Sequence, residues 1–166
     1  MSAEARGELK LLDRYLLAEP SRRAAAEWSI LFAAGIACTL AYAPRIPFQP
    51  LSNVLGALLL LTGFYVHYLA HKAHEKAHER YDKVEKLVTN GIYSKIRHPC
   101  YASVMLMYVG LALAWGYAYL LALALLLCLL AALTALKEEE VLKKKFGEEY
   151  EAYAKRVRWR FVPGLA

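Results

Sequence analysis

The longest uncharged stretch of the sequence, Pro99–Leu136, limits the folds that this chain can adopt. A membrane-spanning helix needs about 20 apolar residues at a rise of ~1.5 Å per residue, so this stretch is too long for one span and must turn back on itself. A tryptophan, a glycine and two tyrosines lie near its middle, at 115–119. Aromatic residues are typical of the membrane–water interface. The sequence therefore predicts a transmembrane helical hairpin over residues 99–136.

Two further uncharged runs, 28–44 and 46–66, precede the hairpin in a chain that is 58% hydrophobic. Together they predict an all-α polytopic membrane protein with about four transmembrane helices and amphipathic interfacial helices. Residues 1–23 are charged throughout, so we expect the first span to be retained rather than removed with a signal peptide. The expected single domain has an N-terminal interfacial helix (1–23), transmembrane helices 1 and 2 (24–70), a cytoplasmic connecting segment (71–98), the hairpin (99–136) and a C-terminal cytoplasmic amphipathic segment (137–166).

Basic residues are distributed unevenly between the predicted loops. Of the 21 Lys and Arg residues, only Arg45 lies in the first loop, and the hairpin tip has none. Short positively charged loops stay in the cytoplasm, so both termini and segment 71–98 are expected on the cytoplasmic face of the cell membrane. The net charge of +6 then reflects topology and anionic lipid, and no nucleic-acid partner is predicted. A compact chain rich in Ala, Leu, Lys and Glu is typical of a prokaryotic source.

The C-terminal segment has apolar residues at helical spacing between charged ones. Such a helix is expected to lie against the membrane or over the bundle. Gly147 interrupts it at a cost of ~1 kcal/mol relative to alanine, which predicts a bend or a close contact there. The apolar positions are Val141, Leu142, Phe146, Tyr150, Tyr153 and Val157.

Four histidines follow the second span at steps of four, three and four: His67, His71, His74 and His78. On one helical face, this spacing would suit zinc, copper or nickel, although such a site usually needs a ligand from another element. The other interpretation is an amphipathic interfacial helix whose polar face uses histidine. The sequence leaves both open.

A basic pair introduces the hairpin. Arg97 and His98 stand before Pro99, which is favoured as a first helical residue because its missing N–H would be unpaired there. The N–H groups that follow would face an anionic group. Alternatively, the two basic side chains simply anchor the helix at the lipid headgroups.

Three consecutive glutamates, Glu138, Glu139 and Glu140, follow the hairpin. They can interact with a helix dipole. A carboxylate beside a basic cluster and an apolar chamber can also hold an ammonium group, such as that of a small zwitterionic cofactor.

From Leu87 to the C-terminus the sequence resembles the membrane methyltransferases that include isoprenylcysteine carboxyl methyltransferase and phosphatidylethanolamine N-methyltransferase. The matching features are Leu87-Val88-Thr89-Asn90-Gly91-Ile92-Tyr93, Arg97-His98-Pro99-Cys100-Tyr101, the hairpin, Glu138-Glu139 with Leu142, Phe146-Gly147-Glu148-Glu149-Tyr150, Tyr153, Val157 and Pro163. The resemblance implies S-adenosylmethionine as cofactor and a lipophilic small-molecule or lipidated acceptor at the cytoplasmic membrane face.

The resemblance also implies roles for individual residues. Arg97 and His98 would be catalytic, with His98 positioning the acceptor or taking its proton. Tyr150 and Tyr153 would pack a C-terminal lid. The cofactor would contact Glu85, Lys86, Leu87, Val88, Tyr93, His98, Pro99, Cys100, Tyr101, Glu138 and Glu139, with Glu138 at its amino group.

Two positions depart from the family pattern. Ser103 stands where many relatives have glycine, and Thr134 stands where the prenylcysteine enzymes have an arginine associated with the substrate. Thr134 therefore marks the expected substrate position, and the carboxylate of a prenylated cysteine is not the expected acceptor.

Two other functions compete with methyl transfer. A membrane sterol or enone reductase that uses NADPH has a similar C-terminal pattern. Its cofactor phosphates would, however, favour more Arg and Lys in the pocket and fewer glutamates than Glu138, Glu139 and Glu140 provide. A membrane metal-binding or haem-binding protein would use the four histidines instead.

Overall fold

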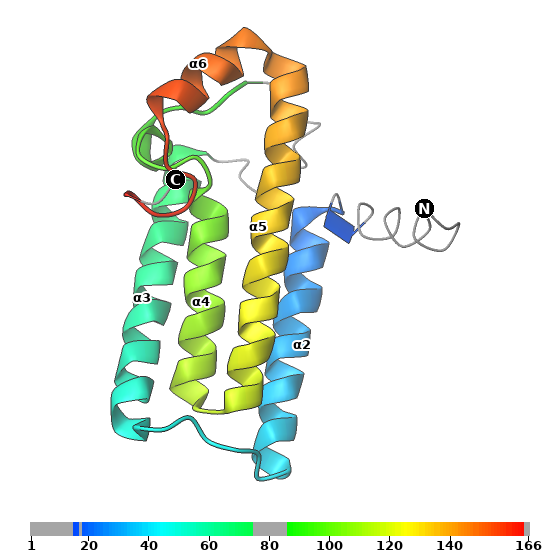
Figure 1. Ribbon diagram of the computed structural model, residues 1–166, viewed down its shortest axis with the longest axis vertical. Helices are drawn as coiled ribbons and strands as arrows, with labels where there is room; N and C mark the ends of the chain where they lie inside the picture. Colours follow the sequence, from blue (N-terminus) through cyan, green and yellow to red (C-terminus); the bar gives the residue numbers. More distant parts are fainter. Residues whose placement is uncertain (1–14, 17, 75–85, 165–166) are drawn as a thin grey trace, which may run out of the picture.

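The computed structural model describes residues 15–16, 18–74 and 86–164, and its elements in this part of the chain are helical. Figure 1 shows the long helices α2, α3, α4 and α5 side by side, with the short helix α6 across one end of the bundle. The elements are α2 (Pro20–Leu40), α3 (Gln49–Ala73), the 3-10 helix η1 (Gly91–Ser94), α4 (Pro99–Trp115), α5 (Ala118–Phe146) and α6 (Glu148–Arg156). This arrangement confirms the predicted all-α fold.

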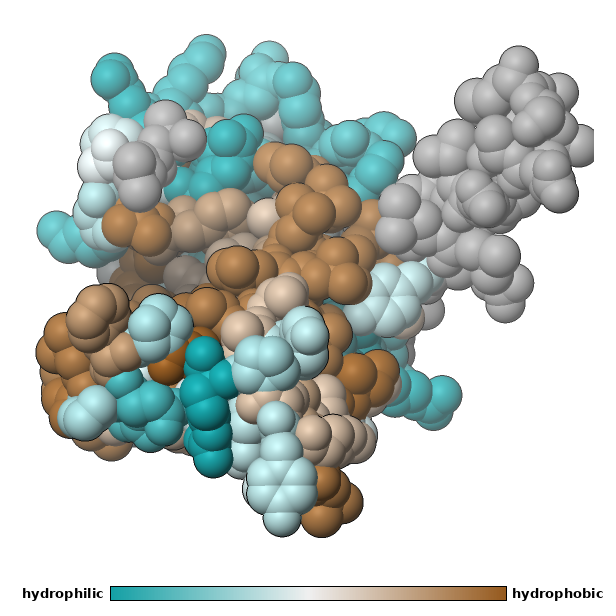
Figure 2. Space-filling model, turned by 60° about the horizontal axis from the view of Figure 1, so that its bottom comes forward, coloured by the Kyte–Doolittle hydropathy of each residue, from teal (hydrophilic) through white to brown (hydrophobic). Residues whose placement is uncertain are grey.

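Three of these helices, α2, α3 and α5, are long and apolar enough to cross a membrane, and α4 is a shorter apolar helix. Large hydrophobic side chains lie exposed along α2 and α3, for example Ile36 and Leu61. Figure 2 shows hydrophobic side chains across the middle of the molecule and hydrophilic ones at its upper edge and on its lower part. Such a surface is stable in lipid rather than in water. The chain is therefore an integral membrane protein.

The predicted hairpin is present, and its tip lies in the segment of small and aromatic residues. Helix α4 ends at Trp115, and Gly116 follows in the left-handed conformation (φ 82°), which favours glycine. Arg45, the basic residue of the first loop, donates a 3.1 Å hydrogen bond to the Trp115 carbonyl. Its guanidinium also lies 4.1 Å from the centre of the Tyr117 ring. Arg45 thus satisfies a helix end and holds the first loop against the tip.

Helices α3 and α4 approach each other closely at glycines. A Cβ atom on Gly56 would lie 2.3 Å from the Ala114 backbone nitrogen and 2.6 Å from the Gly110 carbonyl oxygen. Because these neighbours are backbone atoms, they cannot rotate away. The absence of side chains at Gly56 and Gly110 therefore fixes the spacing of the two helices.

Several helix bounds differ from those predicted. Helix α2 begins at Pro20, before the expected start at 24, and α3 continues to Ala73, beyond the expected end at 70. Helix α5 continues past Leu136 to Phe146, so the first part of the C-terminal amphipathic segment extends a transmembrane helix. The helix breaks at Gly147 (φ 52°, ψ −122°), where the sequence predicts a bend. This break turns α6 back across the bundle end.

Candidate functional site

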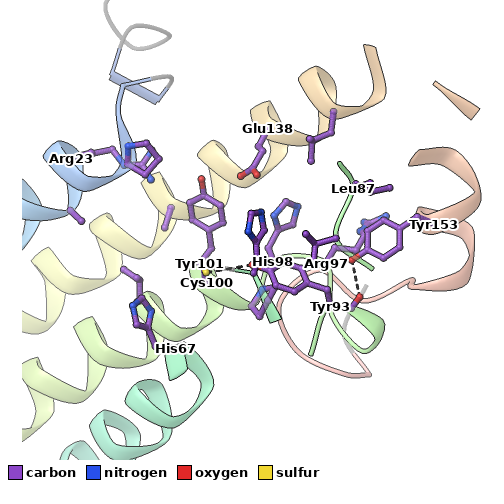
Figure 3. A pocket seen from close by; sticks show the side chains of 18 of the residues that line it. Arg23, His67, Leu87, Tyr93, Arg97, His98, Cys100, Tyr101, Glu138 and Tyr153 are labelled. Atoms are coloured by element: carbon purple, nitrogen blue, oxygen red, sulfur yellow. Dashed lines mark hydrogen bonds between the residues drawn. The ribbon is translucent and has the colours of Figure 1, made fainter. Parts of the chain in front are cut away.

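A cavity opens at the end of the bundle where α4 begins, beneath α6 (Figure 3). It comprises about 1140 Å³ of unoccupied space, including its open mouth. Its walls come from the five helices α2 to α6 and from the segment between α3 and α4. The lining residues are Pro20, Arg23, Ala24, Glu27, His67, His74, Leu87, Val88, Tyr93, Arg97, His98, Pro99, Cys100, Tyr101, Val104, Tyr108, Ala131, Glu138, Leu142, Tyr150 and Tyr153.

Glu139 organises one wall of the cavity from behind. Its Oε1 atom lies 3.0 Å from His98 Nε2 and 3.1 Å from Arg97 Nη2. Arg160 Nε approaches the same carboxylate at 3.3 Å. Three basic side chains therefore surround one largely buried carboxylate, which fixes the orientation of the Arg97-His98 pair.

The C-terminal segment reinforces this wall through the backbone. Arg97 N–H donates to the Trp159 carbonyl and His98 N–H to the Arg160 carbonyl, both at 2.9 Å. These N–H groups precede α4 and would otherwise be unpaired. Trp159 and Arg160 thus hold the start of α4 in place.

Glu138 has a different environment from its neighbour Glu139. It lines the cavity, and Figure 3 shows its carboxylate directed toward Tyr101. Consecutive residues of an α-helix point about 100° apart, so only one of two adjacent glutamates can face the same space. The pair is consequently divided: Glu139 supports the wall, and Glu138 presents a carboxylate to the cavity.

Helix α6 and the segment before α4 close the cavity with tyrosines. Tyr153 donates a 2.8 Å hydrogen bond to the Tyr93 carbonyl. Burial raises the pKa of Tyr153 to about 12, and burial also raises the pKa of Tyr93 well above its ordinary value. Both hydroxyls therefore stay protonated, and can donate hydrogen bonds, throughout the physiological range.

Tyr150 offers a donor that the protein does not use. Its side chain lines the cavity and is 5% exposed. Its hydroxyl is buried and makes no hydrogen bond to any residue that the structure describes. A buried hydroxyl without a partner is costly, so a polar group of a bound ligand would stabilise this position.

The α2 side of the cavity contains two charged residues that the sequence interpretation missed. Arg23 and Glu27 are 8% and 4% exposed, and the Arg23 Nε atom lies 3.3 Å from Glu27 Oε1. Glu27 Oε2 also accepts a 2.6 Å hydrogen bond from the Tyr108 hydroxyl. A signal was present: a charge pair at i,i+4 stands at the start of the first apolar run.

The histidines are divided by the end of α3. His67 and His71 lie on α3, whereas His74 follows it in an extended conformation (φ −140°), so the predicted common helical face does not extend to His74. His78 lies outside the described residues. His67 and His74 line the cavity, and His67 Nδ1 lies 3.0 Å from Ser103 Oγ. Among the described residues, no group of three or more His, Cys, Asp or Glu side chains is arranged to hold a metal ion.

Most residues that the family resemblance implicates lie around the cavity. The structure brings together Leu87, Val88, Tyr93, Arg97, His98, Pro99, Cys100, Tyr101 and Glu138. Lys86 is exposed to solvent and does not line the cavity. Glu139 lies behind the wall, Thr134 is buried against Arg23, and Glu85 lies outside the described residues. Tyr150 and Tyr153, expected to pack a lid, also line the cavity.

Comparison with known proteins supplies an independent view. The model of the phospholipid methyltransferase family matches residues 51–149, which is more than half of the chain. Two curated relatives are a probable 7-dehydrocholesterol reductase of Acanthamoeba polyphaga mimivirus, 26% identical over 86 residues (51% of this chain and 19% of the relative), and a Delta(14)-sterol reductase of Neurospora crassa, 36% identical over 56 residues (34% and 11%).

These relatives are much longer than this chain, which spans about a fifth or less of their length. The family match, in contrast, extends from α3 through the hairpin to the start of α6. It therefore includes the whole wall formed by Arg97, His98 and Glu139, together with Glu138 in the cavity. The chain belongs to the phospholipid methyltransferase family.

Proposed function

We propose that this protein transfers the methyl group of S-adenosylmethionine to a lipophilic acceptor at the cytoplasmic face of the membrane. The observation that carries the proposal is the division of the two glutamates. Glu139 is occupied by Arg97, His98 and Arg160, whereas Glu138 faces the cavity.

The cavity residues fit the cofactor's chemistry. Glu138 would pair with the amino group, and the orphaned Tyr150 hydroxyl would donate to another polar group. Leu87, Val88 and Tyr93 provide an apolar and aromatic wall for the adenosyl part. When bound, S-adenosylmethionine supplies a methyl group already activated on a sulfonium, so the protein needs no residue that activates a leaving group.

The protein's own contribution would be alignment and exclusion of water. The contacts of Arg97 and His98 with Glu139 and with the backbone of residues 159–160 keep both side chains fixed at the wall. For an amine or thiol acceptor, the His98 imidazole is a suitable site for the departing proton. Closure by α6, through the Tyr153–Tyr93 hydrogen bond, would shield the reacting groups from solvent.

The distribution of charge supports the proposed sidedness. The bundle end with the cavity includes α6 and the basic C-terminal residues, whereas the opposite end has Arg45. By the tendency of basic loops to remain in the cytoplasm, the cavity would open toward the cytoplasm, where S-adenosylmethionine is available.

A reductase is the second candidate, because both curated relatives named above are sterol reductases. A phosphate-rich nicotinamide cofactor would need cations that are available for its phosphates. The two arginines that line the cavity, Arg23 and Arg97, are each neutralised by a buried or largely buried glutamate, so neither adds net positive charge for several phosphates. This charge arrangement favours a cofactor with an ammonium group.

Calorimetric titration of the purified protein in nanodiscs with S-adenosylmethionine, S-adenosylhomocysteine and NADPH tests the proposal. We expect both adenosyl ligands to bind, and Glu138→Gln to weaken that binding by tenfold or more, since a charged hydrogen bond contributes about 1.5–3 kcal/mol. Glu140→Gln is the matched control because Glu140 is an exposed carboxylate on the same helix. Binding of NADPH without the adenosyl ligands would contradict the proposal.

A further inference from the structure

A cluster of buried polar side chains occupies the α2 side of the cavity, away from the segment that precedes α4. It consists of Arg23 and Glu27 on α2, Tyr108 on α4 and Thr134 on α5, with Tyr15 before α2. We refer to it as the Arg23 cluster. Ionisable residues within an apolar helix bundle are expensive to bury, so such a cluster is a candidate binding site.

Glu27 is fully engaged within this cluster. Its carboxylate accepts hydrogen bonds from the hydroxyls of Tyr15 and Tyr108 and pairs with Arg23. Two hydroxyl donors and the neighbouring Arg23 cation thus occupy this carboxylate. Glu27 therefore stabilises the cluster rather than offering a carboxylate to a ligand.

Arg23, in contrast, retains donor capacity. Its Nη1 atom donates to Thr134 Oγ1 at 2.7 Å and to the Leu16 carbonyl at 3.1 Å. Thr134 uses its own hydrogen to bond the Leu130 carbonyl at 2.8 Å, so its oxygen can accept from the guanidinium. The guanidinium also interacts with the Tyr101 hydroxyl, and its buried Nε atom makes no hydrogen bond to any residue that the structure describes.

The guanidinium is also held in place relative to the cavity. It lies 5.8 Å from the centre of the Tyr101 ring. Figure 3 shows Arg23 on one side of the Tyr101 hydroxyl and Glu138 on the other. The two charged residues therefore mark opposite sides of the cavity, separated by Tyr101.

The walls next to the Arg23 cluster are apolar. Ala24, Val104 and Ala131 line the cavity there, on α2, α4 and α5. These helices have apolar surfaces that suit lipid. A ligand that uses Arg23 would consequently be amphiphilic, with a polar end at the guanidinium and a chain among these helices.

We infer that the Arg23 cluster binds the polar end of the acceptor and selects an amphiphile that carries a carboxylate or carbonyl oxygen there. A guanidinium has only donors, so it pairs with oxygen acceptors and disfavours an ammonium group. The inference deepens the proposed function, since it names the acceptor's polar group. It also places recognition of the acceptor on α2. The family resemblance instead marks Thr134 as the substrate position, and Thr134 contacts Arg23 through a hydrogen bond.

Three probes that share one alkyl chain and differ in their polar end test the inference without any cofactor: dodecanoate, dodecanol and dodecylamine. Each is titrated calorimetrically into the protein in phosphatidylcholine nanodiscs, and the signal from empty nanodiscs is subtracted. We expect dodecanoate to bind more tightly than dodecylamine. Arg23→Gln should weaken dodecanoate binding by about tenfold, as expected for loss of a charge-assisted hydrogen bond. Arg22→Gln is the control, because Arg22 is the neighbouring exposed arginine.

Removing Arg23 alone leaves Glu27 without its cation, so the double variant Arg23→Gln/Glu27→Gln provides a second test in which both charges are absent. It should show the same loss of dodecanoate binding. Equal binding of dodecanoate and dodecylamine, or unchanged binding in both Arg23 variants, would overturn the inference. If dodecanoate binding depends on Arg23 but S-adenosylmethionine does not bind, the proposed function fails while the inference stands.

Discussion

His98 Nε2 lies 3.0 Å from Glu139 Oε1, a contact that joins the residue before α4 to α5, the second helix of the hairpin. His98 is 5% exposed, and the same carboxylate oxygen lies 3.1 Å from Arg97 Nη2. The hairpin therefore closes at both ends: through Gly116 at its tip and through Glu139 at its base. The cavity depends on the second closure.

Replacing Glu139 with glutamine should destabilise the protein more than any other carboxylate-to-amide change in the α5 glutamate run. The change leaves Arg97 and His98 partly buried without their anion, and removing one partner of a buried pair costs about 3–5 kcal/mol. Thermal unfolding of the detergent-solubilised protein measures the effect. Glu140→Gln should lower the midpoint little, because the Glu140–Lys137 pair is on the surface; equal midpoints for the two variants would contradict the assigned role of Glu139.

Gly56→Ala should destabilise the protein although alanine is the better helix former. The new Cβ atom would meet the Ala114 nitrogen and the Gly110 carbonyl oxygen at less than 3 Å. Overpacking of this kind costs about 1–3 kcal/mol. The unfolding midpoint in a denaturing-detergent titration measures it, with Leu58→Ala on the exposed face of α3 as control. A midpoint at or above that of the wild type would show that α3 and α4 are not in close contact there.

Tyr153→Phe removes the hydrogen bond to the Tyr93 carbonyl and should cost about 0.5–1.5 kcal/mol at neutral pH. The pH dependence has a definite sign. Burial raises the pKa of Tyr153 to about 12, so its stabilising contribution is present below the unfolded value of about 10 and is lost as pH rises through 12. Stability measured from pH 8 to pH 12 should therefore decline less steeply in Tyr153→Phe; the same slope in both proteins would contradict this role.

The sequence predicts the membrane helices and the hairpin because these follow from local patterns. The uncharged run 99–136 must turn back within the membrane, and Gly116 supplies the left-handed residue at the turn. Gly147 likewise predicts the break between α5 and α6. Each feature depends on neighbouring residues in the chain, which the sequence displays directly.

The roles of the individual cavity residues depend on contacts between residues that are distant in the chain. Whether Glu138 or Glu139 faces the cavity is set by the rotation of α5 relative to α4, which the Glu138-Glu139 motif does not encode. Arg23 is 111 positions from Thr134 in the chain, so its guanidinium could be placed beside α5 only by the packing of α2. The i,i+4 spacing of Arg23 and Glu27 marked the pair as unusual but not as part of the cavity.

Transfer of radiolabel from S-adenosyl[methyl-³H]methionine into organic-extractable lipid is the most direct test of the central claim that Glu138 serves a methyltransferase cavity. Membranes containing the wild-type protein are compared with membranes containing Glu138→Gln, Glu140→Gln or no protein. We predict label in the lipid fraction with the wild type and with Glu140→Gln, and at least a tenfold reduction with Glu138→Gln. No protein-dependent label, together with oxidation of NADPH that requires the protein and an added sterol, would contradict the account.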